Sequence, residues 1–197
     1  MVGLMTNKIK PAEYGEMVDL ALSLLQDYGF KTFPLNLNKL CKFLNITLIP
    51  YSALSFEQYD IIIKKGLKSG FTVVSKHVNG VAYYDTYYNN VDEKKERNRF
   101  TIAHEIKHVV NGDFTKVKNE KDEELADYFA KCLLAPQCVL ITNKIYNLDI
   151  VHSKFQISKH CAEIWLNTVC KRICRYGDHC LTSSEKDFIS FLNSDYS

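Results

Sequence analysis

Residues 104–108 read His-Glu-Ile-Lys-His, inside a segment of helical periodicity that runs from about Asp92 to Val110. His104 and His108 are four residues apart, so in a helix both project from one face on successive turns. Two imidazoles placed in this way can bind one metal ion, and Glu105 lies about 100° around the helix, at the edge of the same site. The pattern predicts a metal centre with His104 and His108 as ligands and Glu105 as general base.

The ends of this helix are also marked in the sequence. Asp92 and Glu93 are expected in its first turn, where the helix dipole favours carboxylates, and Asn111-Gly112 is expected as a left-handed C-cap. A further helix is expected from a cap at Asn119 or Asp122 through Leu134. Two consecutive helices joined by a polar turn can bring a third ligand to the histidines.

The third ligand distinguishes types of zinc site. A metzincin needs a histidine ten residues after the first one, and this sequence has Phe114 there, which excludes that class. Glu123 on the second helix is the predicted ligand. Asp127, four residues later on the same face, is predicted to accept the N–H of a ligand histidine, whereas Glu124 points about 100° away.

The sequence alone leaves two alternatives to Glu123 as the third metal ligand. The acids of the stretch 122–127 are also typical of a solvated helix N-terminus. Glu120 and Asp113 are substitutes for Glu123 as the third ligand.

The rest of the chain predicts an α+β fold, a small and largely antiparallel sheet packed on the helix that carries the histidines. Turn signals include Asn79-Gly80 for a hairpin. The expected helices are at about Ala12–Tyr28, Leu37–Leu44, Ile145–Arg175 with a break at Gln156–Ser158, and Ser184–Leu192 with Ser183 or Ser184 as cap; the expected strands are Ile46–Ile49, Asp60–Ile63, Gly70–Ser75 and Val78–Asp85, with Tyr87–Asn90 as a polar loop.

Length and composition limit the classes of protein. The 197 residues, 46% of them hydrophobic and 24% charged, suffice for one core with a small appendage. We expect a catalytic domain over residues 1–140 and a helical C-terminal extension over residues 141–197, packed on the same core. A formal net charge of +2 gives no electrostatic footprint for nucleic acid or for an anionic membrane.

The N-terminal segment and the cysteines indicate the cellular compartment of the protein. Met1–Lys10 contains no apolar run of the length that a secretory signal needs, and no stretch has the apolar length of a membrane span. Seven cysteines, an odd number, predict mostly free thiols in a reducing, cytoplasmic setting. The residues Cys170, Cys174, His179 and Cys180 offer the chemistry of a second zinc site, but they lack the C-x-x-C spacing typical of one.

Two blocks of this sequence resemble the ImmA/IrrE family of metallo-endopeptidases. The first is residues 99–108, Arg-Phe-Thr-Ile-Ala-His-Glu-Ile-Lys-His, and the second is residues 123–136, from Glu123 through Phe129-Ala130 to Leu133-Leu134-Ala135-Pro136. Glu123 falls on the metal-binding glutamate of the family pattern. Lys107 departs from it, since many members have glycine there. Phe155–Leu166 resembles the helix-turn-helix-like segment of the family.

The resemblance implies a zincin-like fold, zinc as cofactor, and a cytoplasmic protease that cleaves an XRE-type repressor of a phage or mobile element. Manganese suits the same nitrogen and oxygen donors. Two rival readings are a metal-bound, non-catalytic module that binds a regulator, and a DNA-binding regulator stabilised by metal. Glu105 argues against the first, and the near-neutral charge argues against the second. Among 12 tyrosines, none stands out as an oxyanion donor, and the oligomeric state is open.

Overall fold

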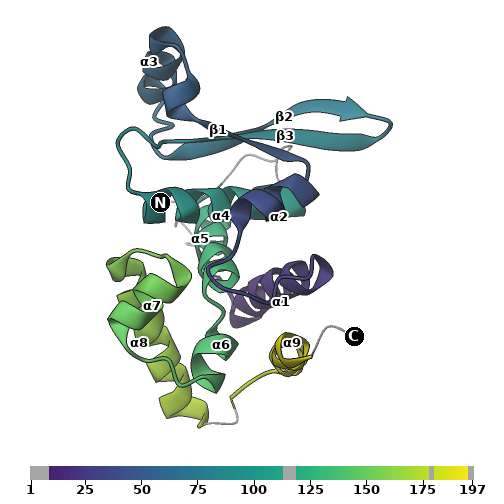
Figure 1. The fold of residues 1–197 in the computed structure, drawn as a ribbon, viewed down its shortest axis with the longest axis vertical. Helices are drawn as coiled ribbons and strands as arrows, with labels where there is room; N and C mark the ends of the chain where they lie inside the picture. The colour runs from purple at the N-terminus through teal and green to yellow at the C-terminus, as the bar shows by residue number, and fades with distance from the viewer. Residues whose placement is uncertain (1–8, 113–118, 178–179, 195–197) are drawn as a thin grey trace, which may run out of the picture.

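A three-stranded sheet lies against the helix that carries the two histidines (Figure 1). The computed structural model describes residues 9–112, 119–177 and 180–194. The sheet consists of β1 (Ile46–Pro50), β2 (Gly70–Val78) and β3 (Val81–Tyr88), and the histidines lie on α4 (Lys95–Asn111). On the side of α4 away from the sheet, α5 (Glu120–Leu134) leads towards the C-terminal helices.

The other helices precede α4 or follow α5 in the chain. They are α1 (Pro11–Asp27), α2 (Leu37–Phe43), the 3-10 turn η1 (Tyr51–Ala53), α3 (Phe56–Lys64), α6 (Gln137–Thr142), α7 (Leu148–Phe155), α8 (Lys159–Tyr176) and α9 (Ser183–Asn193). Figure 1 shows α6, α7 and α8 together at the end of the molecule opposite the sheet, with α9 beside α1.

The sheet has the order β1-β3-β2, with β2 and β3 antiparallel and β1 and β3 parallel. The hairpin at Asn79-Gly80 is confirmed, and both residues have positive φ (50° and 80°), as a two-residue turn that matches strand twist requires. The α+β class is confirmed. The parallel pair makes the sheet mixed, whereas a largely antiparallel sheet was expected.

The expected strand at Asp60–Ile63 is wrong, because these residues belong to helix α3. The run of isoleucines favours a strand locally. A capping box overrides that preference: Ser55 Oγ accepts from the backbone N–H of Gln58, and the Gln58 side chain accepts from the N–H of Ser55. The helix has no buried residue, so its isoleucines are not core positions.

The start of α4 and the end of β3 also differ from the sequence prediction. Asn89 accepts from the backbone N–H groups of Val91 and Asp92, which makes a turn before the helix. The helix therefore begins at Lys95 and its first-turn acid is Glu96, not Asp92 or Glu93. Residues 87 and 88, expected in a loop, extend β3. The predicted C-cap is confirmed, with Gly112 at a φ of 64°.

One continuous core joins the N-terminal and C-terminal helices. It includes fully buried side chains from α1, α5, α7 and α9, among them Leu25, Phe129, Phe155 and Phe188. Trp165 of α8 is also buried, and its indole N–H donates to the carbonyl of Ala135 at 2.6 Å. The division of the chain at residue 140 stays a prediction, and it runs through this shared core.

The C-terminal helices correct several details of the sequence reading. Helix α6 was not predicted, α7 begins at Leu148 rather than Ile145, and Thr182, not Ser183 or Ser184, caps α9. The break between α7 and α8 lies at the expected place, with Gln156 in the left-handed conformation (φ 51°). All seven cysteines are free, as predicted.

One described segment, Glu120–Thr142, is apolar and long enough to cross a membrane by length and composition. Its most apolar window is 78% buried inside the protein. This segment comprises α5 and α6 and serves as the core helix region on which α1 and α4 pack.

An ion pair between Arg172 of α8 and the buried Glu185 links α8 to α9. The guanidinium of Arg172 donates from Nη1 to Oε1 of Glu185 at 2.7 Å and from Nη2 to the carbonyl of Cys180 at 2.7 Å. Glu185 is 1% exposed, so its charge depends on this partner.

We expect Glu185→Ala to lower the free energy of unfolding by about 3 kcal/mol, because it leaves the partly buried charge of Arg172 without its carboxylate. Lys64→Ala is the control, since it breaks the exposed pair with Asp60 and should cost less than about 1 kcal/mol. Urea unfolding of both variants measures this, and equal losses would contradict the role of the buried pair.

Candidate active site

The two histidines of α4 converge as their spacing predicts. Nε2 of His104 and Nε2 of His108 lie 3.2 Å apart, on successive turns of the helix. His108 is completely buried, whereas the side chain of His104 is 14% exposed and lines a cleft. Only one ring of the pair opens to solvent.

Glu123 of α5 completes a cluster with these two rings. Its Oε2 lies 3.1 Å from Nε2 of His104, and its Oε1 lies 3.4 Å from Nε2 of His108. Within the described part of the chain, this is the only group of three or more His, Cys, Asp or Glu residues whose ligand atoms come together. We call His104, His108 and Glu123 the metal cluster.

The donor atoms of the metal cluster fit a small divalent ion. Ligands at about 2.0–2.1 Å in tetrahedral geometry lie about 3.3–3.4 Å from one another. The two ring nitrogens lie 3.2 Å apart, and they lie 3.1 and 3.4 Å from Oε2 and Oε1 of Glu123 respectively, all close to that value. One donor atom from each of the three residues lies within 4.8 Å of the other two. Two nitrogens and a carboxylate are also the donor set of a common class of catalytic zinc site.

Asp127 lies behind His104, one turn after Glu123. Its Oδ1 is 2.8 Å from Nδ1 of His104, a distance at which the ring N–H donates to the carboxylate and leaves Nε2 free for a metal. Burial raises the pKa of Asp127, but the hydrogen bond with His104 and the charges of Lys131 and Arg97 contribute to a net lowering of this pKa.

Glu105 differs from the other acids of the site because it is 4% exposed. Its Oε2 has no hydrogen-bond partner among residues 9–112, 119–177 and 180–194. A buried carboxylate oxygen without a donor is costly, and such a group is retained where a ligand or a proton supplies the missing interaction. This orphaned oxygen lies beside the metal cluster in the same cleft.

The structure distinguishes Glu123 from the other acidic residues considered as the third metal ligand. Glu124 turns to α1, where the hydroxyl of Tyr14 donates to its Oε1 at 2.6 Å, and this hydrogen bond raises the pKa of Tyr14 to about 12. Glu120 is exposed and is not part of the metal cluster. Asp113 lies outside the described residues, as do Phe114 and His179.

The cleft at the metal cluster has a volume of about 270 Å³. Its walls include residues that sequence reasoning missed: Ser69 and Gly70 at the start of β2, and Arg97 and Thr101 of α4. A Ser-Gly pair before a strand is a recognisable turn signal, but only the packing of β2 on α4 puts it beside the histidines. Of the residues considered for a second zinc site, Cys170 and Cys174 on α8 are exposed and join no group of potential metal ligands among the described residues.

Lys107 is the other unexpected residue of the active-site helix. It stands where many members of the family have glycine, and the structure buries it to 1% exposure. A lysine so deeply buried is unusual in a globular protein. Its aliphatic stem is therefore packed inside the protein rather than exposed to solvent.

The fold and the site together define a class of protein. It is an α+β protein in which α4 presents two histidines and Glu105, and α5 supplies a third potential ligand, Glu123. Residues 86–167 match the model of peptidase family M78, described as the IrrE N-terminal-like domain. This match supports an ImmA/IrrE-family metallopeptidase, in agreement with the resemblance seen in the sequence. No curated protein matches the chain.

We expect Asp127→Ala to weaken metal binding by about 10- to 100-fold, because His104 loses the acceptor that fixes its ring. Competition with a chromophoric chelator measures the affinity. Asp122→Ala is the control on the same helix, outside the metal cluster. An unchanged affinity in Asp127→Ala would show that the 2.8 Å contact does not orient the ring.

Gly70 allows β2 to approach α4. A Cβ at this position would lie 2.6 Å from Cγ2 of Thr101 and 2.7 Å from the carbonyl oxygen of Tyr87. We expect Gly70→Ala to lower the free energy of unfolding by about 1–3 kcal/mol, because the backbone of β2 or of β3 at Tyr87 must move to admit the methyl group. The control is Gly15→Ala in α1, where an added Cβ has no described atom within 4 Å. This variant should raise the free energy of unfolding by about 0.5–1 kcal/mol, because alanine is the better helix former. Shifts of the same sign in urea unfolding would contradict this account.

Proposed function

We propose that this chain is a zinc-dependent endopeptidase and that its substrate is a partner XRE-type repressor. The convergence of His104, His108 and Glu123 at distances of 3.1–3.4 Å, beside the orphaned oxygen of Glu105, is the observation that carries the catalytic part. The choice of a repressor rests on the family resemblance. So does the cytoplasmic setting, with which the free cysteines agree.

Zinc is the proposed metal because two imidazoles and one carboxylate leave one tetrahedral position for water or substrate. Manganese accepts the same donors and is the alternative metal. When bound at such a site, zinc lowers the pKa of water towards about 7 and polarises a carbonyl.

Glu105 is the proposed general base. Its carboxylate takes a proton from the attacking water while the water oxygen bonds to the peptide carbonyl carbon. The same carboxyl then gives the proton to the amide nitrogen as the carbon–nitrogen bond breaks, so that a carboxylate and an amine are released. Asp127 holds the ring of His104 in the tautomer that the site requires.

The sheet edge offers a place for the peptide. β2 is the last strand in the order β1-β3-β2, and it packs on α4, with Gly70 in the wall of the cleft. An extended substrate that pairs with this edge would gain main-chain hydrogen bonds and reach the metal cluster. This mode suits cleavage at a flexible linker between folded domains.

The decisive experiment uses Glu105→Gln and His104→Ala, each incubated with an XRE-type repressor as substrate. We expect wild type and Glu105→Gln to carry about one metal and His104→Ala none. Cleavage by Glu105→Gln should fall by about 100-fold or more, because the base is removed while the metal ligands stay. Glu124→Gln, which changes the acid that faces Tyr14, should retain metal and activity.

Metal content and cleavage together separate the competing functions. Metal retained by His104→Ala would overturn the ligand assignment. Repressor bound by a metal-loaded wild type but never cut would favour the non-catalytic, regulator-binding module. Binding of the chain to duplex DNA at low salt would contradict the expectation of no direct nucleic-acid contact.

A further inference from the structure

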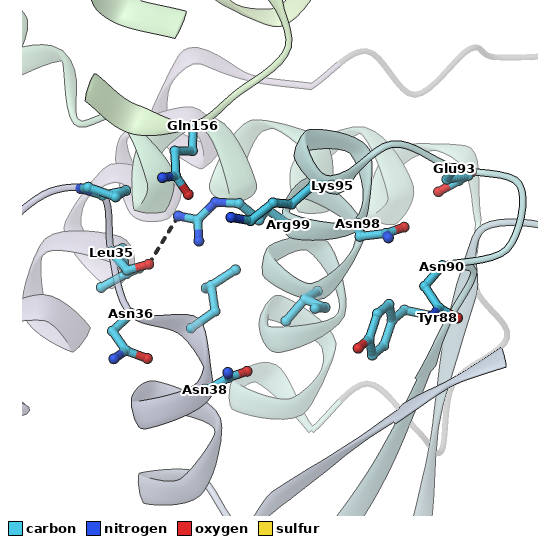
Figure 2. Close-up of a pocket in the computed structure, with 13 residues that line it drawn as sticks. Leu35, Asn36, Asn38, Tyr88, Asn90, Glu93, Lys95, Asn98, Arg99 and Gln156 are labelled. Atoms are coloured by element: carbon cyan, nitrogen blue, oxygen red, sulfur yellow. Dashed lines mark hydrogen bonds between the residues drawn. The ribbon is translucent and has the colours of Figure 1, made fainter. Parts of the chain in front are cut away.

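A larger cleft lies on the face of α4 that points away from the metal cluster (Figure 2). Its volume is about 580 Å³, in the range of small-molecule sites. Helix α4 contributes residues 95, 98, 99 and 102, which share one helical face, while the active-site cleft uses positions 97, 100, 101, 104 and 105. The two clefts therefore lie on different faces of one helix.

Arg99 provides a partly desolvated positive charge in this cleft. Its Nη2 donates to the carbonyl of Leu35 at 3.0 Å, the hydrogen bond drawn in Figure 2. Its Nε is buried and has no acceptor in the described part of the chain, and no described carboxylate lies within 4.0 Å of the guanidinium. Burial lowers the pKa of Arg99, which is the cost of a cation without a counter-ion.

The start of α4 adds to the positive potential at the same place. The N-cap residue Lys94 makes no side-chain cap, so the first N–H groups of this 17-residue helix lack the usual acceptor from that residue. Lys95, the first helical residue, lines the cleft and stands four residues before Arg99 on the same face. A helix N-terminus together with two cations favours an oxyanion.

Asn98 is the second, independent sign of a missing ligand. It is 9% exposed, it lines the cleft, and its Oδ1 has no hydrogen-bond donor among the described residues. The Oε2 of Glu93, at the other end of the cleft in Figure 2, is buried and likewise without a described donor. Such orphaned acceptors indicate a ligand that carries donors as well as a negative group.

We propose that this cleft binds a small organic molecule in which a carboxylate or phosphate stands beside hydroxyl or amino donors. The negative group pairs with Arg99 and Lys95, where guanidinium and ammonium make charge-assisted hydrogen bonds. The hydroxyl or amino groups donate to Oδ1 of Asn98 and Oε2 of Glu93. This site is separate from the proposed protease centre and does not depend on it.

The test is calorimetric titration of the full-length protein with two probes, glycerol phosphate and L-serine, at millimolar concentrations. The first carries a phosphate with hydroxyl donors, and the second a carboxylate with hydroxyl and amino donors. We expect at least one probe to bind wild type, and Arg99→Met and Lys95→Met to weaken its binding by about 10-fold or more. Lys94→Met, which removes an adjacent exposed charge outside the cleft, should bind as wild type does.

His104→Ala locates the binding site, because a probe held at the metal cluster would be lost with the metal. Unchanged probe affinity in this variant supports the second cleft even where the protease proposal fails. Lys95→Met keeps the test valid if Arg99→Met does not fold, since Lys95 is exposed and makes no ion pair in the described chain. Binding of neither probe to wild type, or equal affinity in Lys95→Met and Lys94→Met, would overturn the proposal.

Discussion

The packing of α4 on α5 is the constraint on which the candidate active site depends. Three potential ligands come from these two helices, and their nitrogen and oxygen atoms face one another at 3.1–3.4 Å. Small buried residues lie on both helices, Ala103 on α4 and Ala126 and Ala130 on α5, and the distance between helix axes follows the size of the side chains at their contact. A wider separation would move Glu123 away from the histidines.

The surroundings hold this helix pair from both sides. The sheet covers one side of α4, and Gly70 permits β2 to come close enough to wall the cleft. Helix α1 packs along α5, where the hydroxyl of Tyr14 binds Glu124 and so turns that acid away from the metal cluster. Farther out, Trp165 binds the carbonyl of Ala135 at the end of α5, which joins the C-terminal helices to the same core.

Helix α4 contributes side chains to two different clefts. One face of the helix carries the metal cluster and the buried carboxylate of Glu105, and the other carries Arg99 and Asn98 beside the larger cleft. Each face holds buried polar atoms that lack partners among the described residues. Because buried polar groups are normally satisfied, both faces fit the binding of something other than the protein itself.

Local spacing was sufficient to predict the convergence of the two histidines, the hairpin at Asn79-Gly80 and the cap at Gly112, because each depends on backbone periodicity over a few residues. It placed Glu123 and Asp127 on one face of α5, but only the tertiary structure brings that face to the histidines. Packing alone also decided that β1 pairs in parallel with β3 and that Ser69, Gly70 and Arg97 line the cleft. The run Asp60–Ile63 shows the limit of local propensity, since a capping box and solvent exposure make it helical. Contacts between residues distant in the chain depend on how the helices and the sheet pack, and no local pattern encodes them.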